Sequence, residues 1–222
     1  MKNQTKLIAI AGGSGAGKTW LADRLQHAFG PRAARLSLDD FYRNRSHLPS
    51  EARAEINFDH PDAIDWPLFE QVVGNCRQGR PTPAPRYDFA THARLPGREN
   101  FVPAPLVLVD GLWLLWRPHL LQWFDLKIYL DCPAQLRLER RLGRDVAERG
   151  RSPEAVRGQF WKTVAPMHDQ FVAPQAKWAD LTLKTPVNRG ELRELVEILE
   201  LELRPAMAPA THGASRDALQ AA

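Results

Sequence analysis

Apolar residues along this chain gather in short runs that are separated by stretches with helical periodicity. Four runs rich in branched residues lie at residues 6–11, 106–109, 126–130 and 181–183, and a weaker one lies at residues 35–38. A continuous apolar run bounded by turn residues is typical of a strand that is buried on both faces of a parallel sheet. We therefore predict that these runs are the strands of such a sheet.

Helical patterns fill the intervals between the apolar runs. They cover residues 18–28, 64–78, 134–149, 153–171 and 189–203. Strands that alternate with helices favour a three-layer α/β fold with a doubly wound, mostly parallel sheet. At 222 residues the chain has a size that one such domain commonly reaches. We expect a single domain over residues 1–204.

Two segments do not fit the alternating pattern. Residues 81–105 hold six prolines, which predicts a loop or a short antiparallel excursion from the sheet, and long ordered loops are usually functional. The Ala-rich residues 205–222 lack periodicity, so we expect a disordered tail there.

Charge and composition narrow the classes of partner. The 30 Lys and Arg residues only slightly exceed the 26 Asp and Glu residues, but six arginines cluster between Arg137 and Arg151, which suits an anionic ligand such as a nucleotide phosphate. There is no nucleic-acid-binding motif and no apolar run long enough to span a membrane, so we expect neither partner. Two cysteines without metal-ligand spacing fit a reducing cytoplasm.

The strongest motif in the sequence is a glycine-rich loop that follows the first predicted strand and opens the first predicted helix. It consists of Gly12, Gly13, Ser14, Gly15, Ala16, Gly17, Lys18 and Thr19. This pattern and context predict a phosphate-binding loop, in which backbone N–H groups surround phosphate oxygens. We expect Lys18 to reach the β- and γ-phosphates and Thr19 to bind Mg²⁺. The alternative is a merely flexible turn.

A pair of carboxylates, Asp39 and Asp40, follows the second predicted strand. The carboxyl ends of parallel strands open onto the ligand crevice of such folds, so a carboxylate here would lie near the γ-phosphate. A general base for a hydroxyl acceptor needs an acceptor-only group within hydrogen-bond reach. A helix cap or a solvated turn is the alternative for both residues.

Several separated motifs, in the right order, resemble the uridine-cytidine kinase family within the phosphoribulokinase and uridine kinase group of P-loop kinases. Beyond the phosphate-binding loop they are SLDDFY at residues 37–42, NFDHPDA at 57–63, YDF at 87–89 with His92, RDVAERGR at 144–151 and PMHDQF at 166–171. The resemblance implies a P-loop nucleotide-binding fold and transfer of the γ-phosphoryl group of ATP or GTP, with Mg²⁺, to the 5′-hydroxyl of uridine or cytidine.

The resemblance also implies roles for individual residues. Asp39 matches the base that takes the proton of the 5′-hydroxyl, and Asp59 matches the residue that holds the ribose hydroxyls, for which two vicinal donors suit one carboxylate. The residues that match the pyrimidine pocket are Tyr87, Phe89 and His92. As alternatives, Asp59 would be a turn or cap residue and His92 a surface residue of a proline-rich loop. The acceptor-binding segment would span about residues 40–105.

An arginine-rich lid helix is implied over residues 134–152. Arg141 and Arg151, together with Gln159, match positions that contact the nucleoside, and Arg144 and Arg149 are placed to neutralise triphosphate charge. Acidic residues interleave with these arginines, so a solvated, salt-bridged helix face is the alternative.

Some positions depart from the family pattern. Asp110 ends an apolar strand, where a carboxylate would hold Mg²⁺ directly or through water, but the family usually carries Glu there. Residues 184–188 replace a family sequence that lies near the adenine, so contacts with the donor base are open. Trp113 and Trp116 replace smaller residues, with core packing or a reshaped acceptor pocket as the two interpretations.

Two rival functions follow from the same motifs. One is a related kinase that acts on a sugar or a vitamin precursor, which would not need Asp59, Tyr87 and His92. The other is a nucleotide-binding regulator without phosphoryl transfer, which would not need Asp39. The sequence leaves open the choice between uridine and cytidine, the donor nucleotide and whether the chain forms a homo-oligomer.

Overall fold

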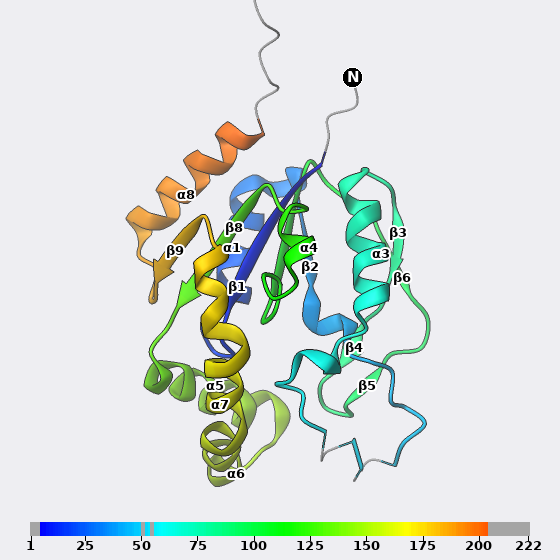
Figure 1. Cartoon of the computed structure of the whole chain (residues 1–222), viewed down its shortest axis with the longest axis vertical. Helices are drawn as coiled ribbons and strands as arrows, with labels where there is room; N and C mark the ends of the chain where they lie inside the picture. Colours follow the sequence, from blue (N-terminus) through cyan, green and yellow to red (C-terminus); the bar gives the residue numbers. More distant parts are fainter. Residues whose placement is uncertain (1–4, 50–51, 54–55, 204–222) are drawn as a thin grey trace, which may run out of the picture.

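The protein, described here by a computed structural model over residues 5–49, 52–53 and 56–203, is built around a five-stranded parallel sheet (Figure 1). The strand order is β2-β7-β1-β8-β9. The strands are β1 (Lys6–Gly12), β2 (Ala33–Ser37), β7 (Leu106–Gly111), β8 (Leu126–Asp131) and β9 (Leu181–Lys184). The apolar runs of the sequence therefore predicted the sheet correctly.

The register of the strands brings their carboxyl ends to one edge of the sheet. Asp110 in β7 lies between Ile10 of β1 and Ser37 of β2, and Gly12 of β1 lies opposite Leu130 of β8. Because all five strands run in the same direction, the loops after β1, β2 and β7 meet at this edge. The edge faces the lower part of Figure 1.

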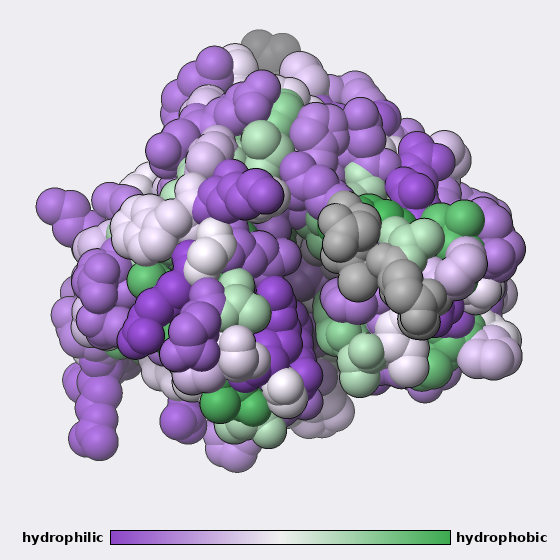
Figure 2. All heavy atoms as spheres, turned by 90° about the horizontal axis from the view of Figure 1, so that it is seen from below, coloured by the Kyte–Doolittle hydropathy of each residue, from purple (hydrophilic) through white to green (hydrophobic). Residues whose placement is uncertain are grey.

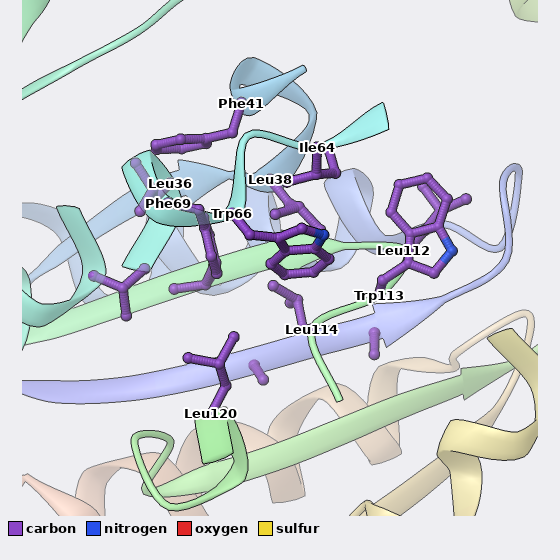
Figure 3. Close-up of a cluster of buried hydrophobic side chains, with 14 of the residues drawn as sticks. Leu36, Leu38, Phe41, Ile64, Trp66, Phe69, Leu112, Trp113, Leu114 and Leu120 are labelled. Carbon is purple, nitrogen blue, oxygen red and sulfur yellow. The ribbon is translucent and has the colours of Figure 1, made fainter. Parts of the chain in front are cut away.

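Helices cover both faces of the sheet. Helices α1 (Lys18–Phe29) and α8 (Arg189–Glu202) pack on the face that holds Ile8 and Ile10. Helices α3 (Trp66–Arg77) and α4 (Pro118–Leu121) pack on the opposite face, where Figure 3 shows a cluster of buried leucine and aromatic side chains. Both sets of alternating side chains in β1 are therefore buried, as its continuous apolar run predicts.

The proline-rich segment forms two short antiparallel ribbons. One pairs β3 (Thr82–Ala84) with β6 (Glu99–Phe101), and the other pairs β4 (Tyr87–Asp88) with β5 (Ala93–Arg94). The expectation of an antiparallel excursion is confirmed. Before it, α3 begins two residues later than the pattern indicated, because Asp65 caps the helix and accepts a hydrogen bond from the backbone N of Leu68.

The lid helix α5 (Ala134–Arg149) has the bounds that the sequence predicted. The following helical stretch does not have a uniform geometry. It comprises α6 (Pro153–Gln159), α7 (Ala165–Met167) and two π-helical turns, Phe160–Val164 and His168–Val172. Pro166 lies inside this stretch and cannot donate a backbone hydrogen bond, which explains why one regular α-helix over residues 153–171 was wrong in detail.

Short 3₁₀ turns connect several of these elements. They are Gly30–Arg32, Leu38–Phe41, Pro61–Ala63 and Ala173–Trp178. The turn Leu38–Phe41 directly follows β2 and therefore sits at the carboxyl edge of the sheet.

The two tryptophans that follow Gly111 have different surroundings. Trp113 is fully buried in the hydrophobic cluster on this face of the sheet, which confirms the packing interpretation (Figure 3). Trp116 is 38% exposed and packs edge-on against Phe171. No helix in the described part of the chain is long and apolar enough to cross a membrane. The expected disordered tail, residues 205–222, lies outside the described residues.

Candidate active site

The phosphate-binding loop joins β1 to α1 and lies tightly against the lid helix. Gly15 and Gly17 have positive φ angles of 82° and 98°, which favour glycine. A Cβ atom on Gly15 would lie 2.5 Å from the carbonyl oxygen of Arg137. The glycines are therefore required both by the turn and by the close approach of α5.

Lys18 lies inside this loop. Its Nζ donates a hydrogen bond to the carbonyl oxygen of Gly13 at 2.9 Å, and the side chain is buried. Burial lowers the pKa of Lys18, while the nearby carboxylates of Asp39 and Asp110 act in the opposite direction. The ammonium group thus lies between the carbonyl oxygen of Gly13 and the carboxylates of Asp39 and Asp110.

Asp110 is buried and both of its carboxylate oxygens have partners. The Thr19 hydroxyl donates to Oδ2 at 3.2 Å, and Arg35 Nε donates to Oδ1 at 3.1 Å. Since the Thr19 proton points to Asp110, the hydroxyl lone pairs stay available for a cation. Oxygen ligands of this kind fit Mg²⁺, which keeps several waters and phosphate oxygens in its shell. Asp110 thus orients the Thr19 hydroxyl.

Arg35 is a site residue that sequence reasoning missed. It also pairs with Asp23 of α1, at 2.9 Å between Nη1 and Oδ1. Its only sequence signal is a charge inside an otherwise apolar strand, because a lone Arg in a buried strand needs a partner.

Asp39 lies on the 3₁₀ turn after β2. Its Oδ1 atom is buried and has no hydrogen-bond partner among the described residues. Burial raises the pKa of Asp39 to about 6, against the opposing effect of Lys18. The Oδ1 atom of the neighbouring Asp40, in contrast, accepts a hydrogen bond from the backbone N of Tyr87 at 3.0 Å. One carboxylate of the pair is thus free for chemistry, and the other fixes β4.

A single pocket collects residues from the phosphate-binding loop, the Asp39 turn, the proline-rich segment and the lid. It is lined by Ser14, Asp39, Tyr42, Phe58, Asp59, Tyr87, Phe89, His92, Leu112, Arg141, Arg144, Arg149, Arg151 and Gln159. The residues that the resemblance assigned to the acceptor all line it. Seen from below, the molecule is hollowed between two lobes, and hydrophilic residues gather along the hollow (Figure 2).

Aromatic side chains form one wall of this pocket. His92 stacks on Phe58 with ring centroids 4.8 Å apart and an interplanar angle of 15°. Tyr87 contacts both Phe89 and Tyr42. Burial lowers the pKa of His92, so its imidazole is neutral near pH 7 and offers one donor and one acceptor. Sequence reasoning missed Phe58 and Tyr42, although both stand beside residues that it selected.

Asp59 faces the same pocket and is only 9% exposed. Burial raises its pKa, and the nearby Arg141 guanidinium opposes that effect. The Tyr42 hydroxyl donates to the carbonyl oxygen of Phe58 at 3.0 Å, which fixes the backbone just before Asp59. A buried carboxylate in this position can accept two hydrogen bonds from a polar ligand.

The lid arginines are held by short contacts to the rest of the site. Arg141 Nη1 donates to the Ser14 hydroxyl at 2.6 Å, which ties α5 to the phosphate-binding loop. The Gln159 side-chain oxygen accepts hydrogen bonds from both Arg141 and Arg151. Asp145, one of the acidic residues that interleave with the arginines, is fully buried on the arginine face. The arginine face of α5 therefore carries an ion-pair cluster around the buried Asp145, in which Arg141 is also buried and the other arginines are partly exposed.

A second pocket lies beside the phosphate-binding loop and is mostly apolar. Its lining comes from the loop, α1, β8, α5 and the segment after β9, and consists of Ala16, Gly17, Trp20, Leu130, Arg140, Thr185, Pro186 and Val187. Arg140 Nη1 donates to the carbonyl oxygens of Gly15 and Ala16, so its planar guanidinium is fixed in the wall. Asn188 does not line the pocket, because its side chain caps α8.

Comparison with known proteins shows the family of the chain. The model of the phosphoribulokinase / uridine kinase family matches residues 7–189. A uridine kinase of Chloroflexus aggregans is 44% identical over 79% of this chain and 84% of the relative, and one of Staphylococcus epidermidis is 41% identical over 82% and 88%.

A solved structure has a similar fold. The crystal structure of phosphoribulokinase from Rhodobacter spheroides superposes with a TM-score of 0.61 at 19% identity, over 82% of this chain and 71% of that one. The family model covers most of the sheet and both pockets. The chain therefore belongs to the phosphoribulokinase / uridine kinase family.

Proposed function

We propose that this protein is a nucleoside kinase that transfers the γ-phosphoryl group of ATP or GTP to the 5′-hydroxyl of uridine or cytidine. Membership of the family makes the chain a phosphotransferase that takes its phosphoryl group from a nucleotide and gives it to a hydroxyl group. The similarity to uridine kinases supports a pyrimidine nucleoside as the acceptor.

One observation carries the proposal: Asp39 and Asp59 line the same pocket as an aromatic wall and the lid arginines. A base, a ligand for sugar hydroxyls and a stacking surface for a flat ring are the parts that 5′-phosphorylation of a nucleoside requires. The pocket opens toward Ser14 of the phosphate-binding loop, so the acceptor and the donor phosphates would meet at Asp39.

The donor would bind along the phosphate-binding loop. Backbone N–H groups of the loop and the start of α1 would surround the β-phosphate, and Lys18 would contact the β- and γ-phosphates. The apolar pocket at Trp20 and Pro186 is adjacent to the loop and would take the base of the donor, with the Arg140 guanidinium in its wall.

The acceptor would bind between the ribose ligand and the aromatic wall. Asp59 would accept hydrogen bonds from the 2′- and 3′-hydroxyls, while Arg141 and Arg151 would contact the nucleoside beside Gln159. The pyrimidine would lie against Tyr87 and Phe89, and the neutral His92 would hydrogen-bond its C4 substituent. An imidazole can serve either the oxygen of uracil or the amino group of cytosine.

The chemical step would be an in-line displacement. Asp39 would take the proton of the 5′-hydroxyl as the 5′-oxygen bonds to the γ-phosphorus, and the bond to the β,γ-bridging oxygen would break to release the nucleoside diphosphate. Arg144 and Arg149 would stabilise the developing negative charge. Thr19 would hold Mg²⁺, with Asp110 behind it, and this ion would neutralise β- and γ-phosphate charge when bound. Positioning and electrostatics would supply most of the rate.

Two rivals make different demands on the site. A kinase of sugars or vitamin precursors has no use for the stacked pair Phe58 and His92, and a buried Asp59 would repel a sugar phosphate such as ribulose 5-phosphate. A nucleotide-binding regulator has no use for a carboxylate with a pKa raised to about 6 beside Lys18.

The acceptor would be identified by measuring ADP release from ATP and Mg²⁺ with a panel of hydroxyl compounds. The panel holds uridine, cytidine, the purine nucleosides, ribulose 5-phosphate and simple sugars. We expect acceleration by pyrimidine ribosides alone. Faster ADP release with ribulose 5-phosphate or a sugar, and not with uridine or cytidine, would refute the proposed acceptor.

We include a cytoplasmic location in the proposal, because the thiols of Cys76 and Cys132 are free. The proposed reaction does not depend on whether the chain forms a homo-oligomer. Small molecules are the partners that the two pockets fit.

A further inference from the structure

The carboxylate of Asp145 is completely buried in the lid and is surrounded by four arginines. These are Arg141, Arg144, Arg149 and Arg151. A buried carboxylate is costly unless cations and hydrogen bonds compensate it. Four guanidinium groups exceed what one carboxylate needs, so the cluster carries a surplus of positive charge.

The two carboxylate oxygens face different pairs of arginines. Oδ1 lies 2.8 Å from Arg144 Nη2 and 3.4 Å from Arg149 Nη1. Oδ2 lies 3.5 Å from Arg141 Nη2 and 3.9 Å from Arg151 Nη1. All four arginines line the acceptor pocket, but only Arg144 and Arg149 also line the neighbouring hollow that contains Thr19. Under the function proposed above we therefore assign the first pair to the donor phosphates and the second pair to the nucleoside.

The contacts on the Oδ2 side are the weaker ones. Oδ2 has no hydrogen-bond partner among the described residues, and the nitrogen atoms near it are more distant than those near Oδ1. The Gln159 oxygen accepts hydrogen bonds from Arg141 and Arg151 at 3.3 and 2.6 Å, so it links these two side chains. The Asp145 carboxylate therefore interacts more closely with the arginines near Oδ1 than with those near Oδ2, and its closest ion pair is with Arg144.

We propose that Asp145 is a positioning residue that couples donor binding to acceptor binding. When triphosphate oxygens draw Arg144 and Arg149 toward the donor, the negative charge of Asp145 is left to Arg141 and Arg151. These arginines are then held more firmly in the geometry that binds the nucleoside. The inference rests on the proposed function, because it assigns one pair of arginines to each substrate.

The coupling has a measurable size and direction. Uridine carries no net charge for the donor to attract, and a direct contact between its 5′-hydroxyl and the γ-phosphate does not depend on Asp145. The part of the affinity change that is lost on removing the charge of Asp145 must therefore pass through the lid. Couplings between two sites commonly reach about five- to 150-fold, and they are reciprocal. We expect a non-hydrolysable ATP analogue with Mg²⁺ to raise the affinity for uridine roughly tenfold, at the low end of that range.

The test is calorimetric titration of uridine into the full chain with and without the analogue. In Asp145→Asn, which keeps the shape but loses the charge, we expect the affinity for uridine to be the same in both titrations. Asp145 competes with phosphates for Arg144 and Arg149, so the variant should bind the analogue as tightly as the wild type or more tightly. A loss of general lid structure would weaken analogue binding instead.

The matched control is Glu139→Gln, which removes a charge from an exposed position of the same helix and should keep the full coupling. If Asp145→Asn does not fold, Arg144→Gln provides a second test. It removes the closest ion pair of the cluster, so it should lower the coupling. Because Arg144 also lines the acceptor pocket, the readout is the ratio of the uridine affinities with and without the analogue, measured on the same variant.

Three results would count against the proposal in different ways. Equal coupling in the wild type and in Asp145→Asn or Arg144→Gln overturns it. So does an affinity of the wild type for uridine that does not change when the analogue is bound. Absence of uridine binding under both conditions would refute the proposed acceptor, and the coupling with it.

Discussion

Arg35 and Asp110 form an ion pair inside the carboxyl edge of the sheet, with 3.1 Å between Nε and Oδ1. Asp110 is 3% exposed, and its other oxygen accepts the hydrogen bond of Thr19. Arg35 thus compensates the buried carboxylate that orients the hydroxyl group of the phosphate-binding loop.

Replacing Arg35 tests this relationship. Arg35→Met leaves Asp110 with one partner, and we expect the free energy of unfolding to fall by about 1–3 kcal/mol because a buried charged group loses a hydrogen bond. The double variant Arg35→Met with Asp110→Asn should recover part of the loss. Urea unfolding of the two single variants and the double variant measures the coupling. Strictly additive losses would show that the two side chains do not interact.

The base is tested by Asp39→Asn. We expect turnover to fall by roughly 10²–10⁴-fold, the usual range for a lost general base, while binding of ATP stays nearly intact. Steady-state kinetics and a binding titration with ATP separate the two effects. Asp40→Asn is the matched control, since Asp40 binds the backbone of Tyr87 and should affect turnover far less. Near-normal turnover in Asp39→Asn would remove this residue from the mechanism.

The pKa of Asp39 predicts a pH dependence. Burial raises that pKa to about 6, and only the deprotonated carboxylate can accept a proton. Activity should therefore be full well above pH 6 and fall as the pH drops through about 6. The pH profile of kcat/KM reports this ionisation in the free enzyme. A profile that stays flat down to pH 5 would contradict the assignment, and the residual activity of Asp39→Asn should lack the fall.

The ribose ligand is tested by Asp59→Ala. A hydrogen bond to a charged group contributes about 1.5–3 kcal/mol, so the KM for uridine should rise roughly ten- to hundredfold or more. A substrate without the 2′- and 3′-hydroxyls should lose a similar factor with the wild-type enzyme and lose little more with the variant. If 2′,3′-dideoxyuridine is penalised equally in both enzymes, Asp59 does not bind the ribose.

The close approach of the lid to the phosphate-binding loop predicts the effect of Gly15→Ala. The new Cβ would lie 2.5 Å from the carbonyl oxygen of Arg137, at a φ of 82°. We expect a loss of about 1–3 kcal/mol in the free energy of unfolding, together with weaker binding of ATP. Gly143→Ala in α5 meets no atom within 4 Å and should instead stabilise the protein. Thermal unfolding with and without ATP compares the two variants.

Much of this architecture follows from the sequence because its causes are local. The apolar run of β1 and the glycines after it determine a strand, a turn and a helix start within a few residues. The bounds of α5 followed in the same way from its periodicity. The π-helical turns on either side of Ala165–Met167 did not, because they depend on how Pro166 is accommodated between packed neighbours.

The parts of the site that the sequence did not reveal depend on contacts across the fold. Arg35 and Asp110 are 75 positions apart and meet only because β2 pairs with β7. Asp145 read as one more acidic residue among arginines, and only the packing of α5 shows that it is the buried one. The stacking of Phe58 on His92 depends on where the proline-rich segment lies in the fold, which the sequence does not show.

Phosphorylation of a pyrimidine nucleoside at its 5′-hydroxyl can be measured by product identification. The protein is incubated with ATP, Mg²⁺ and either uridine or cytidine, and the product is identified by chromatography against standards. We expect UMP or CMP in an amount equal to the ADP released, and no product from the 5′-deoxynucleoside. A phosphate on another hydroxyl, or ADP release without any nucleoside monophosphate, would contradict it.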